Sequence, residues 1–165
     1  MKIRQKEKKD CEAWVDINVK SWNDNLKGVV SPKLLKFILD NRNARIEKDI
    51  VTFKPNDLEY VLENNNRVIG ILKMKKSNRV NYENCGEVQM LYLYTEEKGK
   101  GYGKALINKA FTVLKNKGYK KVVIGCLDGN PSNEFYKHIG GKYVRQEPWD
   151  IMSEHYFENI YEYDI

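Results

Sequence analysis

A glycine-rich turn between a strand-like run and a helix-like run is the feature that most constrains this chain. Residues 87–94, before the turn, are mainly aromatic and branched aliphatic, which suits a largely buried strand. After the turn, apolar residues recur at three- and four-residue steps as in an amphipathic helix, and Gly118 stands where a left-handed C-terminal cap occurs. The sequence therefore predicts a strand, a tight turn and a helix that opens from the turn.

The composition of the turn points to an anionic ligand. It consists of Lys98, Gly99, Lys100, Gly101, Tyr102, Gly103 and Lys104. Glycines let backbone N–H groups approach a ligand closely, and the first turn of a helix offers unpaired N–H groups at the positive end of the helix dipole. Because lysines add positive charge to the same few residues, we expect a ligand that carries phosphate groups.

The glycine spacing disfavours two common types of phosphate-binding site. The P-loop pattern needs a glycine five residues before its Gly-Lys pair and a Ser or Thr after it, but Lys98 and Ala105 hold those places around Gly103-Lys104. The dinucleotide fingerprint needs a third glycine three residues after its second, and that place holds Lys104 or Leu106, depending on the starting glycine. A nucleoside triphosphatase and a Rossmann site are therefore disfavoured.

Two segments resemble signatures of the GNAT superfamily of N-acetyltransferases. Leu91-Tyr92-Leu93 followed by Lys98-Gly99-Lys100-Gly101-Tyr102-Gly103 resembles the acetyl-CoA signature, in which Lys98 replaces the usual Gln or Arg. The segment 130–141 resembles the family's Asn-x-x-Ala-x-x-Phe-Tyr motif, with Asn133 at or beside the small-residue position. The two motifs stand in the family's order, and together they are far more specific than either alone.

The resemblance implies a fold and a cosubstrate. The fold is a single-domain mixed α/β structure over residues 1–165, with a mostly antiparallel sheet, one splayed parallel strand pair and helices on both faces. Acetyl-CoA would place its pyrophosphate on N–H groups from about Lys98 to Lys104 and its pantetheine arm along Leu91, Tyr92 and Leu93. Further cofactor contacts are implied for Asn130, Asn133 and Tyr136. One of several lysines, Lys104 and Lys137 among them, would meet the ribose phosphate.

The resemblance also implies catalytic roles. Tyr136, which follows Phe135, occupies the position of the tyrosine that protonates the departing sulfur in many relatives. Glu87, four residues before Leu91, occupies the position of a glutamate that deprotonates the amine directly or through water. Bulk water is an alternative base, and Glu147 is the reserve candidate.

The resemblance implies that the acceptor is a primary amine of a small molecule or peptide. In this fold the acceptor pocket lies near residues 22–30 and 149–156, where Trp22 and Trp149 occur among acidic residues that suit a cation. A non-catalytic module with the same fold, which binds CoA or regulates another protein, is the alternative.

The composition of the chain narrows the remaining classes of function and partner. The net charge of +6 suggests nucleic acid, but 23 acidic residues are interleaved with 29 basic ones, so a solvated surface with a site for a polyanionic cofactor is preferred. We expect no membrane partner, a cytoplasmic location, and a monomer or homodimer. Three widely spaced cysteines match no metal-ligand pattern, so we expect free thiols and no metal.

The predicted elements follow from local patterns. They are a strand at 2–5, a helix at 10–22, a helix from Ser31-Pro32 with a break towards Ile50, a hairpin of 58–63 and 67–74 around an Asn turn, the central strand and helix, a parallel strand at 119–126, a short helix begun by Pro131, and a closing hairpin of 142–146 and 156–163.

Overall fold

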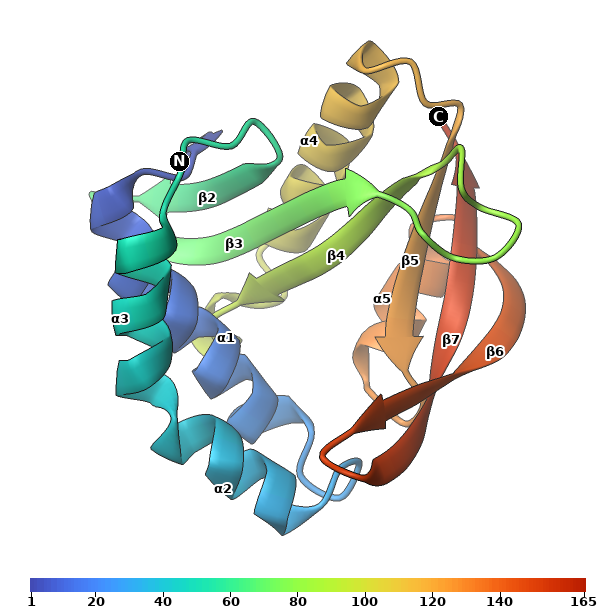
Figure 1. The fold of residues 1–165 in the computed structure, drawn as a ribbon. Coiled ribbons are helices and arrows are strands. Elements are labelled where there is room, and N and C mark those ends of the chain that lie inside the picture. The colour runs from blue at the N-terminus through green and yellow to red at the C-terminus, as the bar shows by residue number, and fades with distance from the viewer. The chain divides into compact units, whose positions relative to one another are not determined.

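The computed structural model describes residues 1–165 and contains seven strands, five α-helices and two 3₁₀ turns. The elements are β1 Lys2–Gln5, η1 Lys8–Asp10, α1 Cys11–Asn25, α2 Pro32–Asp40, α3 Arg42–Thr52, β2 Glu59–Asn64, β3 Arg67–Lys76, β4 Gly86–Leu93, η2 Thr95–Glu97, α4 Tyr102–Asn116, β5 Lys121–Leu127, α5 Ser132–His138, β6 Lys142–Ile151 and β7 Glu154–Asp164. The strand order is β1-β2-β3-β4-β5-β7-β6, with β4 and β5 parallel (Figure 1). The predicted mixed α/β class with one parallel pair is confirmed.

The contacts divide the chain into two compact units. The first comprises Met1–Lys73 and Met90–Lys109, and the second comprises Met74–Gln89 and Ala110–Ile165. The chain passes from one unit to the other within β3, β4 and α4.

The first unit contains an antiparallel ladder and three packed helices. Strand β1 pairs with β2, and β2 pairs with β3 across a turn in which Asn65 and Asn66 have φ of 48° and 61°. Asparagine tolerates this left-handed region, so the Asn run closes a hairpin, as predicted. Helices α1, α2 and α3 contact one another (Figure 1). The Ser31 hydroxyl caps α2 by accepting the Leu34 N–H at 3.0 Å, next to Pro32 in the first turn.

The second unit carries different groups on the two faces of its strands. Tyr163 of β7 packs its ring 5.1 Å from that of Phe111 on α4 and donates a hydrogen bond to the Tyr136 carbonyl of α5 at 2.8 Å, so both helices cover one face. A methyl group on Gly86 would collide with Leu114 of α4, so Gly86 faces that side and the next residue, Glu87, faces the other. The loop at 77–85 covers the Glu87 side with a buried cluster of Tyr82, Cys85, Val123 and Ile160.

Two predicted elements differ in extent. The break after the second helix is complete, so α3 is a separate helix. The closing hairpin is longer than predicted, because β6 continues through Pro148 to Ile151 and turns at Met152 and Ser153, both with positive φ. Proline cannot donate to a ladder, but β6 is the edge strand of the sheet, where this is tolerated.

Candidate active site

The glycine turn of the first unit leads directly into α4. Gly99 and Gly101 have φ of 75° and 82°, and a methyl group added to either would meet nothing within 4 Å. The helix begins its hydrogen bonding with the Ala105 N–H, which donates to the Gly101 carbonyl at 3.1 Å. The N–H groups of residues 101–104 therefore precede the first helical bond and lie at the positive end of the helix dipole. An open backbone with these donors fits an anionic group such as a diphosphate.

Side chains of α1 hold this turn in place. Lys98 Nζ donates a hydrogen bond to Asn25 Oδ1 at 2.5 Å, and Thr95 Oγ1 donates one to Asp24 Oδ2 at 2.8 Å. Lys100 forms an ion pair with Glu97 at 2.9 Å. Lys98 thus replaces the family's usual Gln or Arg with a side chain that fixes the turn from within the protein.

The end of β4 in the first unit carries the predicted pantetheine residues. The parallel register of β4 with β5 runs only from Gly86 to Val88, so the ladder stops before Leu91. The Leu93 side chain is 7% exposed and packs where a methyl group on Gly70 would lie, so it belongs to the core. The Leu93 carbonyl accepts a hydrogen bond from Ser21 Oγ at 2.9 Å, so this group already has a partner within the chain.

Trp22 lies beside the same strand end. Its Nε1 donates a hydrogen bond to the Tyr92 hydroxyl at 3.1 Å. Trp149 belongs to the other unit, where its ring centroid is 6.1 Å from that of Tyr156 across the β6–β7 hairpin. Each of the two tryptophans predicted to bind the acceptor amine therefore contacts a tyrosine of its own unit.

The second unit contains the loop before α5. Asn133 is 7% exposed and uses both ends of its amide within the chain. Its Nδ2 donates to the carbonyls of Leu127 and Asn130 at 2.8 Å, and its Oδ1 accepts from the Tyr161 hydroxyl at 2.9 Å. Asn130 Oδ1 accepts the Ser132 N–H at 2.8 Å. Asn133 therefore organises this loop, and its contact with a cofactor stays a prediction.

Tyr136 is the tyrosine that the family motif singles out, and it is 7% exposed on α5. Its backbone carbonyl accepts hydrogen bonds from the Gly141 N–H at 3.0 Å and from the Tyr163 hydroxyl at 2.8 Å, which fix its position. The hydroxyls of two neighbouring tyrosines, Tyr161 and Tyr163, donate to acceptors inside the protein, and burial raises the pKa of both. Tyr136 occupies the position of the family motif, and its role as proton donor stays a prediction.

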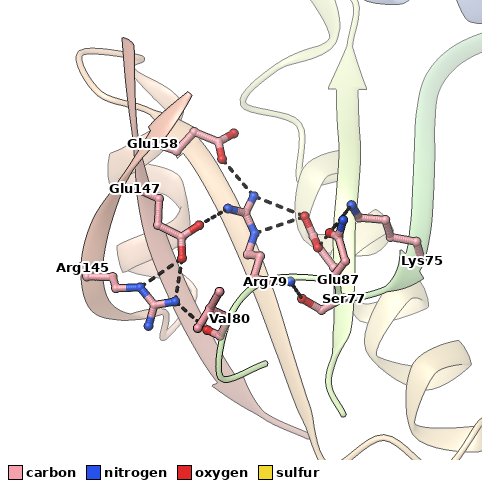
Figure 2. Close-up of polar contacts among 9 residues, drawn as sticks. Lys75, Ser77, Arg79, Val80, Glu87, Arg145, Glu147 and Glu158 are labelled. Atoms are coloured by element: carbon pink, nitrogen blue, oxygen red, sulfur yellow. Dashed lines mark hydrogen bonds and ion pairs between the residues drawn. The ribbon is translucent and has the colours of Figure 1, made fainter. Parts of the chain in front are cut away.

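Glu87 is the buried member of a partly exposed network of charges that Figure 2 shows. It is 4% exposed, and its Oε1 accepts a hydrogen bond from Arg79 Nε at 3.2 Å. Its Oε2 is buried without a hydrogen bond, and Lys75 Nζ forms an ion pair with it at 3.5 Å. A buried carboxylate oxygen that retains hydrogen-bonding capacity can accept a proton.

Glu147, the reserve base, belongs to the same network but has stronger partners. Arg79 and Arg145 each contact its carboxylate at 2.6 Å. Burial alone would raise the pKa of Glu147, but the hydrogen bonds from Arg145 and Arg79 outweigh burial and hold the pKa below its usual value. Because both oxygens are held by guanidinium groups, Glu147 is the weaker base candidate.

The structure thus gathers the predicted residues into two sets. The glycine turn, the 91–93 strand end and Trp22 belong to the first unit, and Glu87, Asn130, Asn133, Tyr136 and Trp149 belong to the second. Sequence reasoning missed Arg79, which contacts Glu87 from the loop before β4.

A model of the acetyltransferase (GNAT) family matches residues 12–140, which include the glycine turn and nearly all of the α5 motif. The chain belongs to the acetyltransferase (GNAT) family. The GNAT resemblance predicted from the two motifs is therefore confirmed.

Solved GNAT structures share the fold over almost the whole chain. The PaiA N-acetyltransferase from Thermoplasma acidophilum in complex with coenzyme A is 22% identical, with 99% of this chain and 98% of that chain covered and a TM-score of 0.77. A GCN5-related N-acetyltransferase from Rhodopseudomonas palustris is 15% identical, with coverage of 99% and 95% and a TM-score of 0.79. YncA, a putative acetyltransferase from Salmonella typhimurium with its cofactor acetyl-CoA, is 22% identical, with coverage of 99% and 93% and a TM-score of 0.65.

The remaining observations concern metal ligands, the length of the helices and the cysteines. No group of three or more His, Cys, Asp or Glu side chains is placed to hold a metal ion, and none of the helices is long and apolar enough to cross a membrane. The three cysteines are free thiols, as predicted. All three are also buried, and burial raises the pKa of Cys11 to about 11 and that of Cys126 to about 12.

Proposed function

We propose that this GNAT chain is an N-acetyltransferase that uses acetyl-CoA to acetylate a primary amine of a small molecule or a peptide. The observation that carries the proposal is the open backbone at Gly99 and Gly101 at the start of α4. The residues fit the coenzyme because the turn offers N–H donors without side chains in front of them, and a diphosphate needs such donors. Two of the similar solved structures were determined with coenzyme A or acetyl-CoA, which supports the same ligand here.

Several residues would hold the coenzyme. The turn at 98–104 would bind the pyrophosphate, residues 91–93 would bind the pantetheine arm, and Asn130 would position the loop before α5. One of several lysines, Lys104 and Lys137 among them, would provide a positive charge for the ribose phosphate. Acetyl-CoA supplies an activated acetyl thioester whose sulfur departs as a thiol.

Glu87 and Tyr136 would each carry out one proton transfer of the reaction. An ammonium acceptor must lose a proton before its nitrogen can attack, and Oε2 of Glu87 would receive that proton directly or through water. As the new N–C bond forms and the C–S bond breaks, the Tyr136 hydroxyl would donate a proton to the sulfur. The attacking nitrogen would release its second proton to solvent, from which the tyrosinate would regain a proton. The acetyl group then resides on the acceptor as an amide, and the coenzyme leaves as a free thiol.

A positively charged amine is the acceptor class that we propose. Trp22 of the first unit and Trp149 of the second would each offer an aromatic ring to such a cation, because cations bind well over aromatic faces. Acidic residues accompany them, with Asp24 on α1 and Asp150 on β6. Neither tryptophan distinguishes a small amine from a peptide amine.

The test is an assay of free thiol release from acetyl-CoA with a panel of amines. The panel includes polyamines, aminoglycosides, amino acids and short peptides. Turnover with at least one amine supports the proposal. Coenzyme binding without turnover would instead support the non-catalytic module. If neither CoA nor acetyl-CoA raises the melting temperature, the assignment of the coenzyme site is wrong, because a native-state ligand must stabilise the fold.

A further inference from the structure

We propose that Arg79 is a positioning residue that holds Oε1 of Glu87 and leaves the buried Oε2 as the oxygen that receives the proton of the acceptor amine, directly or through water. This inference rests on the proposed function, because it assigns a task to Arg79 only if Glu87 acts as the base. No motif of the sequence points to Arg79, which lies in the connection between β3 and β4.

The two oxygens of Glu87 have different environments. Oε1 lies 3.2 Å from both Nε and Nη2 of Arg79, so two nitrogens of one planar group hold it. Oε2 has no hydrogen bond, and its neighbouring cation is Lys75 Nζ at 3.5 Å, which also donates to Asn78 Oδ1 at 3.1 Å. Because a rigid guanidinium fixes one oxygen, the other oxygen has a defined direction.

The guanidinium is itself held by two further carboxylates (Figure 2). Arg79 Nη1 donates to Glu147 Oε2 at 2.6 Å, and Nη2 donates to Glu158 Oε2 at 2.9 Å. Burial acts to lower the pKa of Arg79, but the charges of Glu158 and Glu87 outweigh it and raise the pKa above its usual value. Arg79 therefore stays charged in its partly buried position.

Gly125 of strand β5 leaves space for the Arg79 side chain. A methyl group on Gly125 would lie 2.5 Å from Arg79 Nη2 and 2.8 Å from Glu158 Oε2. Only glycine at this position leaves room for the guanidinium above the strand. The loop that carries Arg79 is also fixed, since Ser77 Oγ accepts the Arg79 N–H at 3.2 Å and Tyr82 packs into the buried cluster below.

A purely structural role for Arg79 is the competing explanation. Glu147 and Glu158 are direct partners across β6 and β7, and two like charges in such a pair destabilise a sheet unless a cation lies between them. Arg79 provides that cation. The two explanations differ in one respect, because a structural clamp acts on stability whether or not Glu87 is present.

The experiment is therefore a double-mutant cycle on turnover, with Arg79→Lys, Glu87→Gln and the double variant. Lysine keeps the positive charge for the carboxylates but lacks the planar fork. We therefore expect the variant to fold and to lose the fixed direction of Glu87. We expect Arg79→Lys to lower kcat about tenfold while the KM for acetyl-CoA changes less than about twofold, since only the direction of the base is disturbed. In the Glu87→Gln background the same substitution should have no further effect on kcat.

Two variants serve as a second probe and a control. Gly125→Ala moves the guanidinium without changing any charge and should also lower kcat, again only when Glu87 is present. Arg145→Gln removes a guanidinium from the same network, where it contacts Glu147 and the Val80 carbonyl but not Glu87, so kcat should stay within about twofold of wild type.

The outcomes separate the inference from the proposed function. Wild-type turnover with an equal loss in Arg145→Gln, or a loss in Arg79→Lys that persists without Glu87, overturns the positioning role alone. Unchanged kcat in Arg79→Lys overturns it as well. A wild-type protein that binds CoA but releases no thiol with any amine overturns both proposals.

Discussion

Lys98 Nζ lies 2.5 Å from Asn25 Oδ1, so the residue that precedes the first loop glycine ties the glycine turn to the last turn of α1. The pair holds the backbone donors of the turn in one arrangement before any ligand arrives. A preorganised site loses less conformational entropy when it binds.

The first prediction concerns this link. Asn25→Ala should weaken CoA binding about threefold to tenfold, because one hydrogen bond to a charged group is lost from the turn. Asn23→Ala is the matched control, since both asparagine amides donate to the carbonyl four residues earlier in α1, but only Asn25 contacts Lys98. Isothermal titration with CoA measures both variants, and equal affinities would contradict the role of the link.

The second prediction concerns the left-handed glycines. Gly101→Ala should cost about 1 kcal/mol of stability, because φ of 82° is unfavourable for alanine, and should weaken CoA binding at least tenfold. Its methyl group would project into the open space in front of the turn. Gly118→Ala has the same kind of strain, with φ of 91° and open space, at the other end of α4. Both should lower the melting temperature, and only Gly101→Ala should raise the Kd.

The third prediction concerns the proton donor. Tyr136→Phe should lower kcat about tenfold to a hundredfold and leave the KM for acetyl-CoA near its original value, because general acid catalysis acts in the transition state. Tyr143→Phe is the control, since Tyr143 is 51% exposed and its ring contact with Tyr161 survives the loss of the hydroxyl. If the two variants retain equal kcat, another group protonates the sulfur.

Local chemistry explains why much of the fold was predictable. The Asn65-Asn66 turn, the Ser31-Pro32 helix start and the glycine turn each depend on backbone preferences of a few adjacent residues. The length of the closing hairpin was not predictable in this way. Pro148 argues against a strand locally, and only the place of β6 at the sheet edge makes it acceptable.

The environment of Glu87 was beyond sequence reasoning for a different reason. Arg79 bonds Glu87, Glu147 and Glu158 at separations of 8, 68 and 79 residues, and no local pattern encodes such contacts. One signal was available. Gly125 interrupts a run of buried strand residues, and a glycine there often marks the close approach of another group.

The last prediction concerns acid stability. Since the folded-state pKa of Glu147 is held below its ordinary value of 4.5, the folded protein binds fewer protons here than the unfolded chain. The stability from its pairing with Arg145 and Arg79 is then complete above about pH 4.5 and is lost as the pH falls through the folded-state pKa. Glu147→Gln should therefore melt below wild type at pH 7, and the gap should narrow on acidification below about pH 4.5.

Thermal unfolding between pH 3 and pH 8 measures this gap. Glu134→Gln is the control, because its carboxylate is 79% exposed and pairs only with Lys137 on the surface of α5. It should follow the wild-type curve at every pH. A gap for Glu147→Gln that stays constant or widens in acid would show that the guanidinium pairing of Glu147 does not stabilise the fold, since the sign of the linkage requires the gap to close.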